Sequence, residues 1–223
     1  PNSDVNYFKT VFDGKWYFPL SRNQRWSFLA RVRLGYGNGY GDINGNEQIL
    51  PFTENFTAGG SDSLRGFENN TVGPRGVFLG NTGTIVGPDG EVFPGDPADA
   101  QLSWSTRSLG GNAMALGGIE LIVPTPFVEE EMDNSVRTSL FVDVGNVWDT
   151  EFDYDYYRQF DIASTQRGEL LDYSDWSLYR SSAGISVQWV SPMGPMVFSF
   201  SKAIQQRDGD DARFFTFNIG QTF

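Results

Sequence analysis

The chain has 223 residues, and its 28 Asp and Glu against 16 Lys and Arg give a net charge of −12, which argues against a nucleic-acid-binding groove. It contains neither histidine nor cysteine, which excludes disulfides, thiol nucleophiles and nearly all zinc sites. No stretch of about 18 uninterrupted apolar residues predicts a transmembrane helix. Glycine and aromatic residues are abundant although the apolar content is only 39%, an unusual balance for a soluble core.

Apolar and polar residues alternate with a period of two, which is typical of β-strands, between connections rich in Gly, Pro, Asn and Asp. The segment 135–149 shows the pattern best, because Val142 lies on an apolar face and Asp143 on the opposite one. Helical periodicity is nearly absent. The pattern predicts an all-β protein with seven strands, at 5–19, 26–40, 111–123, 135–149, 179–190, 196–204 and 213–223.

The two faces of these strands differ in how many charged residues they carry. If the more apolar faces point outward, they carry two charges, Lys202 and Arg213, whereas the inward faces carry ten. A charge on a lipid-facing surface costs about 2–4 kcal/mol at the bilayer centre. A soluble sandwich is the alternative, but it needs strands of only about five or six residues, and most of these are long enough to cross a bilayer. The sequence therefore favours a transmembrane antiparallel β-barrel, with aromatic residues near the strand ends: Tyr36, Tyr40, Trp148, Tyr179, Trp189 and Phe223.

The connections alternate between shorter ones (20–25, 124–134 and 191–195) and longer ones (41–110, 150–178 and 205–212). Bacterial outer-membrane barrels have short periplasmic turns and longer external loops. We therefore expect the short turns and the C-terminus in the periplasm and the long loops outside. Seven strands are an odd number, and closing them alone would leave edges in lipid, so we expect residues 1–223 to be the C-terminal part of one larger barrel domain.

The sequence contains no recognisable catalytic motif. Without histidine no ordinary catalytic triad can form. The glycines at 59, 60 and 66 lack the Gly-Lys-Ser/Thr of a phosphate-binding loop, and the acidic run 208–211 lacks the spacing of a calcium-binding loop. We expect no enzyme activity, no cofactor and no metal site. The acidic residues of loops 41–110 and 150–178 fit a solvated surface, or a weaker alternative in which divalent cations bridge them to lipopolysaccharide.

The connection 41–110 is far longer than structureless loops usually are, which indicates a function. Its central cation, Arg65, lies between apolar anchors, and Gly66 permits close backbone approach. The inward strand faces offer two carboxylates on consecutive strands, Glu120 and Asp143, which a guanidinium can bind in bidentate fashion. We therefore predict that the loop folds back into the barrel and is held there by this arginine.

The segment Leu64-Arg65-Gly66-Phe67 resembles the (V/I/L)RGF motif in the sixth external loop of the superfamily of outer-membrane insertases and two-partner-secretion transporters. Eight further segments resemble more narrowly the barrel-assembly factors of Gram-negative outer membranes: 54–60, 69–74, 110–114, 124–127, 134–139, 145–149, 188–195 and 217–220. The resemblance covers essentially the whole chain and implies the last seven of sixteen strands. Within the long loop, residues 77–109 match no family pattern.

The resemblance implies two sets of functional residues. The first, the loop lock, holds the long loop in the lumen and consists of Arg65, Gly66, Phe67, Glu120 and Asp143. The second, the lateral seam, lies where the last strand opens away from the first, and it also carries the C-terminal recognition signal; it consists of Phe215, Phe217, Asn218, Ile219, Gly220 and Phe223. Gly220 lets the strand kink, unless it only relieves crowding in the lumen.

The function implied is the insertion and folding of β-barrel proteins in the cell outer membrane. An opened seam exposes backbone groups that can pair with an incoming strand. The partners implied are nascent outer-membrane proteins, accessory assembly lipoproteins, lipid and lipopolysaccharide, and no nucleic acid. Two alternatives are a two-partner-secretion transporter, which would keep only the RGF motif, and a passive porin or structural barrel, which would need a constricting loop with sorted charges.

Overall fold

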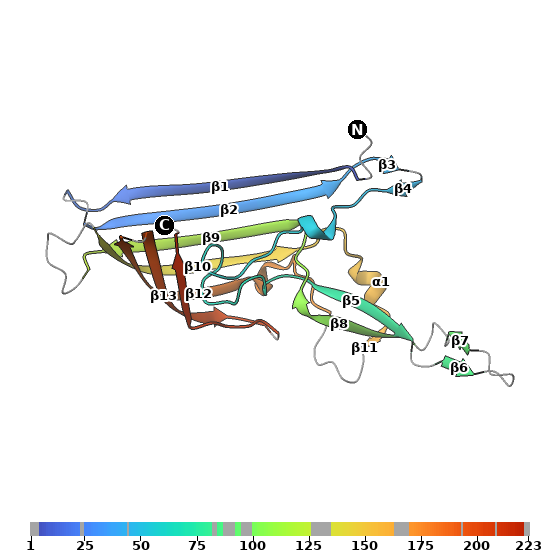
Figure 1. Cartoon of the computed structure of the whole chain (residues 1–223). Coiled ribbons are helices and arrows are strands. Elements are labelled where there is room, and N and C mark those ends of the chain that lie inside the picture. The colour runs from blue at the N-terminus through green and yellow to red at the C-terminus, as the bar shows by residue number, and fades with distance from the viewer. Residues whose placement is uncertain are drawn as a thin grey trace.

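The computed structural model describes residues 5–22, 25–43, 45–81, 84–86, 92–94, 100–125, 135–162, 170–192, 194–207 and 209–220. Its main feature is a seven-stranded antiparallel sheet whose strands follow one another in chain order (Figure 1). The strands are β1 (Tyr7–Pro19), β2 (Ser27–Gly39), β9 (Ala113–Val123), β10 (Val136–Trp148), β12 (Arg180–Ser191), β13 (Gly194–Gln205) and β14 (Phe215–Ile219). All seven predicted strands are confirmed.

The last strand is shorter than the sequence predicts. It begins at Phe215, so Arg213 precedes it and is not one of its outward charges. It ends at Ile219, before Gly220, which has a φ of +87° that favours glycine. Phe223 lies outside the described residues. The strand therefore pairs with β13 over five residue pairs, from Met196–Ile219 to Phe200–Phe215, whereas β12 and β13 form eleven pairs.

The predicted separation of the faces holds across the middle strands. Val142 and Ile185 are exposed on the convex face, whereas Asp143 and Ser186 are fully buried on the concave face. Successive side chains of a strand point to opposite faces, so each polar residue that follows an apolar one is directed into the concave side. This gives the sheet an apolar outer surface and a polar inner one.

The hydrophobic core lies on the concave side and is built largely by the long loop. Figure 1 shows the segment between η1 (Phe52–Glu54) and β5 (Arg75–Asn81) lying within the curve of the sheet. Each large apolar side chain buried there contributes about 1.5–3 kcal/mol. The core residues from the loop and from β9 and β10 are Phe56, Ala58, Leu64, Phe67, Val72, Met114, Leu116 and Val147.

The long connections contain short elements that the sequence did not predict. In the second half of the connection 41–110, β5 pairs with β8 (Ala100–Ser108), and β6 (Thr84–Val86) pairs with β7 (Val92–Pro94). Earlier in the same loop β3 (Asp42–Ile43) pairs with β4 (Asn46–Glu47). The connection 150–178 contains α1 (Tyr154–Arg158), β11 (Asp161–Ile162), which pairs with β8, and η3 (Trp176–Leu178). Among the described residues, no helix has the length and apolarity needed to span a membrane.

The two faces can be tested with spin labels on two neighbouring cross-strand pairs. Leu140 pairs with Ile185 on the convex face, and Ser139 pairs with Ser186 on the concave face. In bilayers, we expect labels at the first pair to collide with oxygen, which concentrates in lipid. Labels at the second pair should be shielded from it. The reverse pattern would contradict a lipid-facing convex surface.

Candidate functional site

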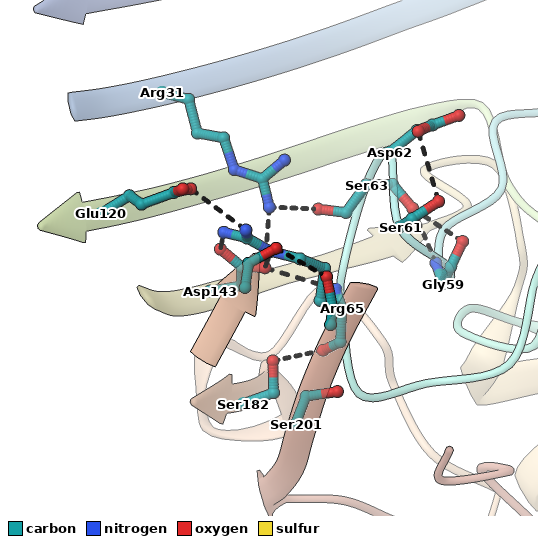
Figure 2. A network of polar contacts seen from close by, with 12 residues as sticks. Arg31, Gly59, Ser61, Asp62, Ser63, Arg65, Glu120, Asp143, Ser182 and Ser201 are labelled. Carbon is teal, nitrogen blue, oxygen red and sulfur yellow. Dashed lines mark hydrogen bonds and ion pairs between the residues drawn. The ribbon is translucent and has the colours of Figure 1, made fainter. Parts of the chain in front are cut away.

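The guanidinium of Arg65 lies between Glu120 and Asp143 on the concave side of the sheet (Figure 2). Its Nε and Nη2 donate to the two oxygens of Asp143 at 2.8 and 3.0 Å, and its Nη1 donates to Glu120 Oε2 at 3.0 Å. No more than 2% of any of the three side chains is exposed. Charge-assisted bidentate contacts of this kind are strong and fix the orientation of the guanidinium.

Residues next to Arg65 hold the loop in this position. Leu64 and Phe67 are fully buried in the hydrophobic core. Gly66 has a φ of +91°, and a Cβ there would come within 2.9 Å of the Cβ of Ser182. The hydroxyl of Ser182 donates to the carbonyl oxygen of Arg65. The motif therefore needs its glycine, because the loop presses directly against β12.

The two carboxylates come from adjacent strands. Glu120 on β9 pairs with Phe141 on β10, and Asp143 follows two residues further along β10 on the same face. Phe141 lies directly opposite Glu120 and two residues before Asp143, and its ring centroid is 3.5 Å from the Cζ of Arg65. An aromatic face so close to a cation adds a cation–π attraction. The strand register therefore presents two acids and one ring to a single guanidinium.

A second cation, Arg31 on β2, completes the network. Its Nη2 lies 2.7 Å from Asp143 Oδ2 and donates to the carbonyl oxygen of Ser63 at 3.3 Å. The strand between β2 and β10 carries Gly118 at this point, paired with both Arg31 and Asp143. A Cβ at position 118 would come within 2.5 Å of the carboxylate and 2.7 Å of the Arg31 Nε. The missing side chain therefore lets the two charges meet across an intervening strand.

Charge balance explains why the network tolerates burial. Removing an arginine from water disfavours its charged form and would lower its pKa. The hydrogen bonds and negative charges of Asp143 and Glu120 outweigh this effect, so the pKa of Arg65 is raised above its ordinary value. Two cations face two carboxylates, and within the described residues only Glu120 Oε1 among these oxygens is buried without a partner. Arg65 therefore stays charged throughout the physiological pH range.

The predicted seam residues occupy the two faces of β14. Phe215, Phe217 and Ile219 are exposed on the convex face, and the ring centroids of Phe217 and Phe198 are 4.9 Å apart. The side chain of Asn218 points the other way, and its amide donates to the hydroxyl of Ser61 in the long loop. The structure thus brings one of the predicted seam residues into contact with the loop.

The other motifs considered in the sequence have local structural roles. Gly59 and Gly60 have φ values of +109° and +92°, and a Cβ at either position would collide with the segment 68–69. They therefore form a turn. Asp208 lies outside the described residues. No group of three or more acidic side chains in the described part of the chain could hold a metal ion.

Sequence reasoning identified Arg65, Glu120 and Asp143 but missed Arg31 and Phe141. Arg31 is one of the ten charges that the sequence places on inward faces, but its contact depends on the register of three strands, which the alternation pattern does not give. The glycine at 118, at the centre of a strand and on its polar face, is the signal that could have found it, because such a glycine marks a close approach.

A family model described as the Omp85 superfamily domain matches residues 1–223. The chain belongs to the Omp85 superfamily. It is 31% identical over 233 residues to the outer membrane protein assembly factor BamA of Neisseria meningitidis, which covers 100% of this chain and 25% of that protein. It is 24% identical over 223 residues to the BamA of Nitratidesulfovibrio vulgaris, covering 99% of this chain and 21% of that protein.

This Omp85 chain also resembles a solved structure, the crystal structure of BamA from Haemophilus ducreyi lacking POTRA domains 1–3. The TM-score is 0.73 at 33% sequence identity, covering 97% of this chain and 35% of that one. The seven-stranded sheet is thus part of an outer-membrane β-barrel, and the similar proteins are assembly factors, not enzymes. The chain spans about a quarter or less of the length of the curated relatives, and the total of sixteen strands stays a prediction.

Replacing Arg65 with alanine should release the loop from the lumen. The change strands Glu120 and leaves Asp143 with Arg31, so we expect a loss of about 3–5 kcal/mol in docking free energy. Protease cleavage within residues 41–110 should become faster in the full-length barrel that carries this segment. The control is Arg33→Ala. The Arg33–Asp13 pair is as short, at 2.7 Å, but each side chain is 42% exposed, so its loss should cost only about 0–1 kcal/mol. Zero coupling between Arg65 and Asp143 in a double-mutant cycle would contradict the contact.

Gly118→Ala should separate Arg31 from Asp143 without removing a charge. The added methyl group displaces both side chains, so we expect a loss of about 1–3 kcal/mol, typical of overpacking. The measurement is the melting temperature of the folded barrel, combined with the cycle Gly118→Ala and Arg31→Gln. If the two losses simply add, Arg31 and Asp143 do not interact through the space above Gly118. Gly117→Ala is the matched control, because a Cβ there would meet other atoms only at 3.8 Å or beyond.

Proposed function

We propose that this chain is the C-terminal part of the barrel domain of an outer-membrane protein assembly factor, which inserts and folds β-barrel proteins through a lateral seam at β14. The observation that carries the proposal is the similarity of the whole chain to BamA proteins in sequence and in structure. Neither alternative, a secretion transporter or a porin, is favoured by these relatives.

The pairing of β14 supports a seam at this strand. Five residue pairs join it to β13, while each other pairing in the sheet has at least ten. A strand held by few hydrogen bonds separates from its neighbours at a lower cost. In lipid an unpaired backbone group is costly, so an incoming strand that pairs with an opened edge is strongly stabilised there. No cofactor or nucleotide is required.

The concave side supports a regulated lumen better than an open pore. The long loop fills it with an apolar core and a buried ion network, whereas a porin needs a water-filled channel. We propose that Arg65, Gly66, Phe67, Glu120 and Asp143 act as a loop lock. In this role they keep the loop inside the barrel while the seam changes state.

The proposal also gives the orientation of the chain in the outer membrane and its partners. The short turns and the C-terminus face the periplasm, and the long connections with β5 and β8 face the outside. Nascent outer-membrane proteins would reach the seam from the periplasm with the help of accessory assembly lipoproteins. The external loops would contact lipopolysaccharide, and Phe223 would end the C-terminal recognition signal.

A disulfide across the seam tests the mechanism. In the full-length assembly factor, cysteines at Asn218 and at the facing position of the first strand should cross-link the seam. Insertion of client barrels should then stop, and reduction should restore it. The control is a disulfide between Ser186 and Ser199, a directly paired position of β12 and β13, which should leave insertion unchanged because these strands stay paired.

A cross-linked seam that still inserts clients at the normal rate would contradict the lateral opening. The assignment of the fold would be unaffected, since it rests on the sheet and on the relatives.

A further inference from the structure

We propose that Arg180 and Asp210 are positioning residues for the last strand: they fix the connection that leads into β14 and so set where the strand begins. This inference rests on the proposed function, because it assigns a role at the same seam. It concerns a second buried ion pair, distinct from the one around Arg65.

The pair joins β12 to the connection between β13 and β14. The Nε and Nη2 of Arg180 donate to the two oxygens of Asp210, both at 2.9 Å. Only 1% of the Arg180 side chain and 3% of the Asp210 side chain are exposed. Two parallel charge-assisted hydrogen bonds allow one relative orientation, so the pair determines position as well as distance.

Arg180 is itself held firmly. Its Nη1 donates to Asn146 Oδ1 at 3.0 Å and to the carbonyl oxygen of Leu178 at 3.1 Å. Its Cζ lies 5.0 Å from the ring centroid of Tyr173, and the amide of Asn146 donates to the carbonyl oxygen of Tyr173 at 2.7 Å. The arginine therefore presents its remaining nitrogens to Asp210 from a fixed frame formed by β10, β12 and the connection 150–178.

Asp210 stands at the start of a segment that contacts the long loop. The backbone N–H of Glu68 donates to the carbonyl oxygen of Asp211 at 2.8 Å, and that of Arg213 donates to the carbonyl oxygen of Gly66 at 2.9 Å. A β-bridge joins Phe67 and Ala212 between these bonds. The residues directly after Arg65 are thus paired with the residues directly before β14.

Two buried arginines therefore act on one segment. Arg65 fixes the loop residues 66–68, to which 211–213 are bonded, and Arg180 fixes Asp210 itself. At its other end β14 is followed by Gly220, whose N–H donates to the carbonyl oxygen of Pro195 and around which there is open space. This asymmetry implies that β14 is anchored by buried ion pairs where it begins and is held more weakly at its other end, by the hydrogen bonds of Gly220 with Pro195 and of Asn218 with Ser61.

A buried ion pair is weak evidence for stability, because apolar residues of similar size often stabilise a protein as well or better. What the ion pair contributes, and apolar residues would not, is a fixed position of the connection that leads into β14. The test is therefore a comparison between Asp210→Asn, which removes the charge, and the double variant Arg180→Met with Asp210→Leu, which fills the space without a directional contact. Arg158→Gln is the control, since the Arg158–Asp155 pair is exposed on α1.

Amide hydrogen exchange of the full-length assembly factor gives the readout. In Asp210→Asn and in the double variant, the amides of β14 should exchange about tenfold faster or more, because the strand opens more often, while those of β9 and β10 keep their rates. The unchanged rates of β9 and β10 are the control that the sheet of the double variant stays folded. Client insertion should slow in both variants and stay unchanged in Arg158→Gln.

Wild-type exchange of β14 in Asp210→Asn would overturn the inference. So would full protection of β14 in the double variant, because the pair would then only fill space. If the seam disulfide fails to block insertion but exchange of β14 still accelerates in Asp210→Asn, the lateral mechanism is wrong and the positioning role stands.

Discussion

The structure depends on keeping an arginine charged inside a barrel. Arg65 is almost completely removed from water, and an isolated buried cation would not be tolerated. Two carboxylates and an aromatic ring compensate for the lost hydration, and a second arginine, Arg31, balances the charge of Asp143. Each of these groups comes from a strand of the sheet. The loop enters the lumen because these partners are there, and its apolar residues then form the core.

The residues on both sides of Arg65 also connect the long loop to β14 at the edge of the sheet. The backbone on the C-terminal side of Arg65 pairs with residues 211–213, and the side chain of Asn218 contacts Ser61 on its N-terminal side. A displacement of the loop must therefore alter the surroundings of β14. For the proposed function, this gives a physical route by which the contents of the lumen influence the pairing of β14.

The strands and their inward and outward faces could be predicted from the sequence, because the period-two alternation is strong where one face meets lipid and the other is polar. Val142 and Asp143 illustrate it: their order in the chain determines their faces. The partners of Arg65 were identified because few carboxylates lie on inward faces of consecutive strands. The pairing of β5 with β8 was not predicted, since most of its residues follow no family pattern. The contact of Arg180 with Asp210 was not predicted either, because it joins a strand to a turn far along the chain.

Gly118 also has a consequence for how the strands find their alignment during folding. The space above it accepts the Arg31–Asp143 contact in one alignment of β9 and β10. A slip of two residues, which preserves the inward and outward faces, would place either Glu120 or Leu116 opposite Asp143. The first alternative brings two negative charges together, and the second fills the space with a branched side chain. Alternation alone cannot distinguish these alignments, whereas the absence of a side chain at position 118 favours the one that the structure adopts.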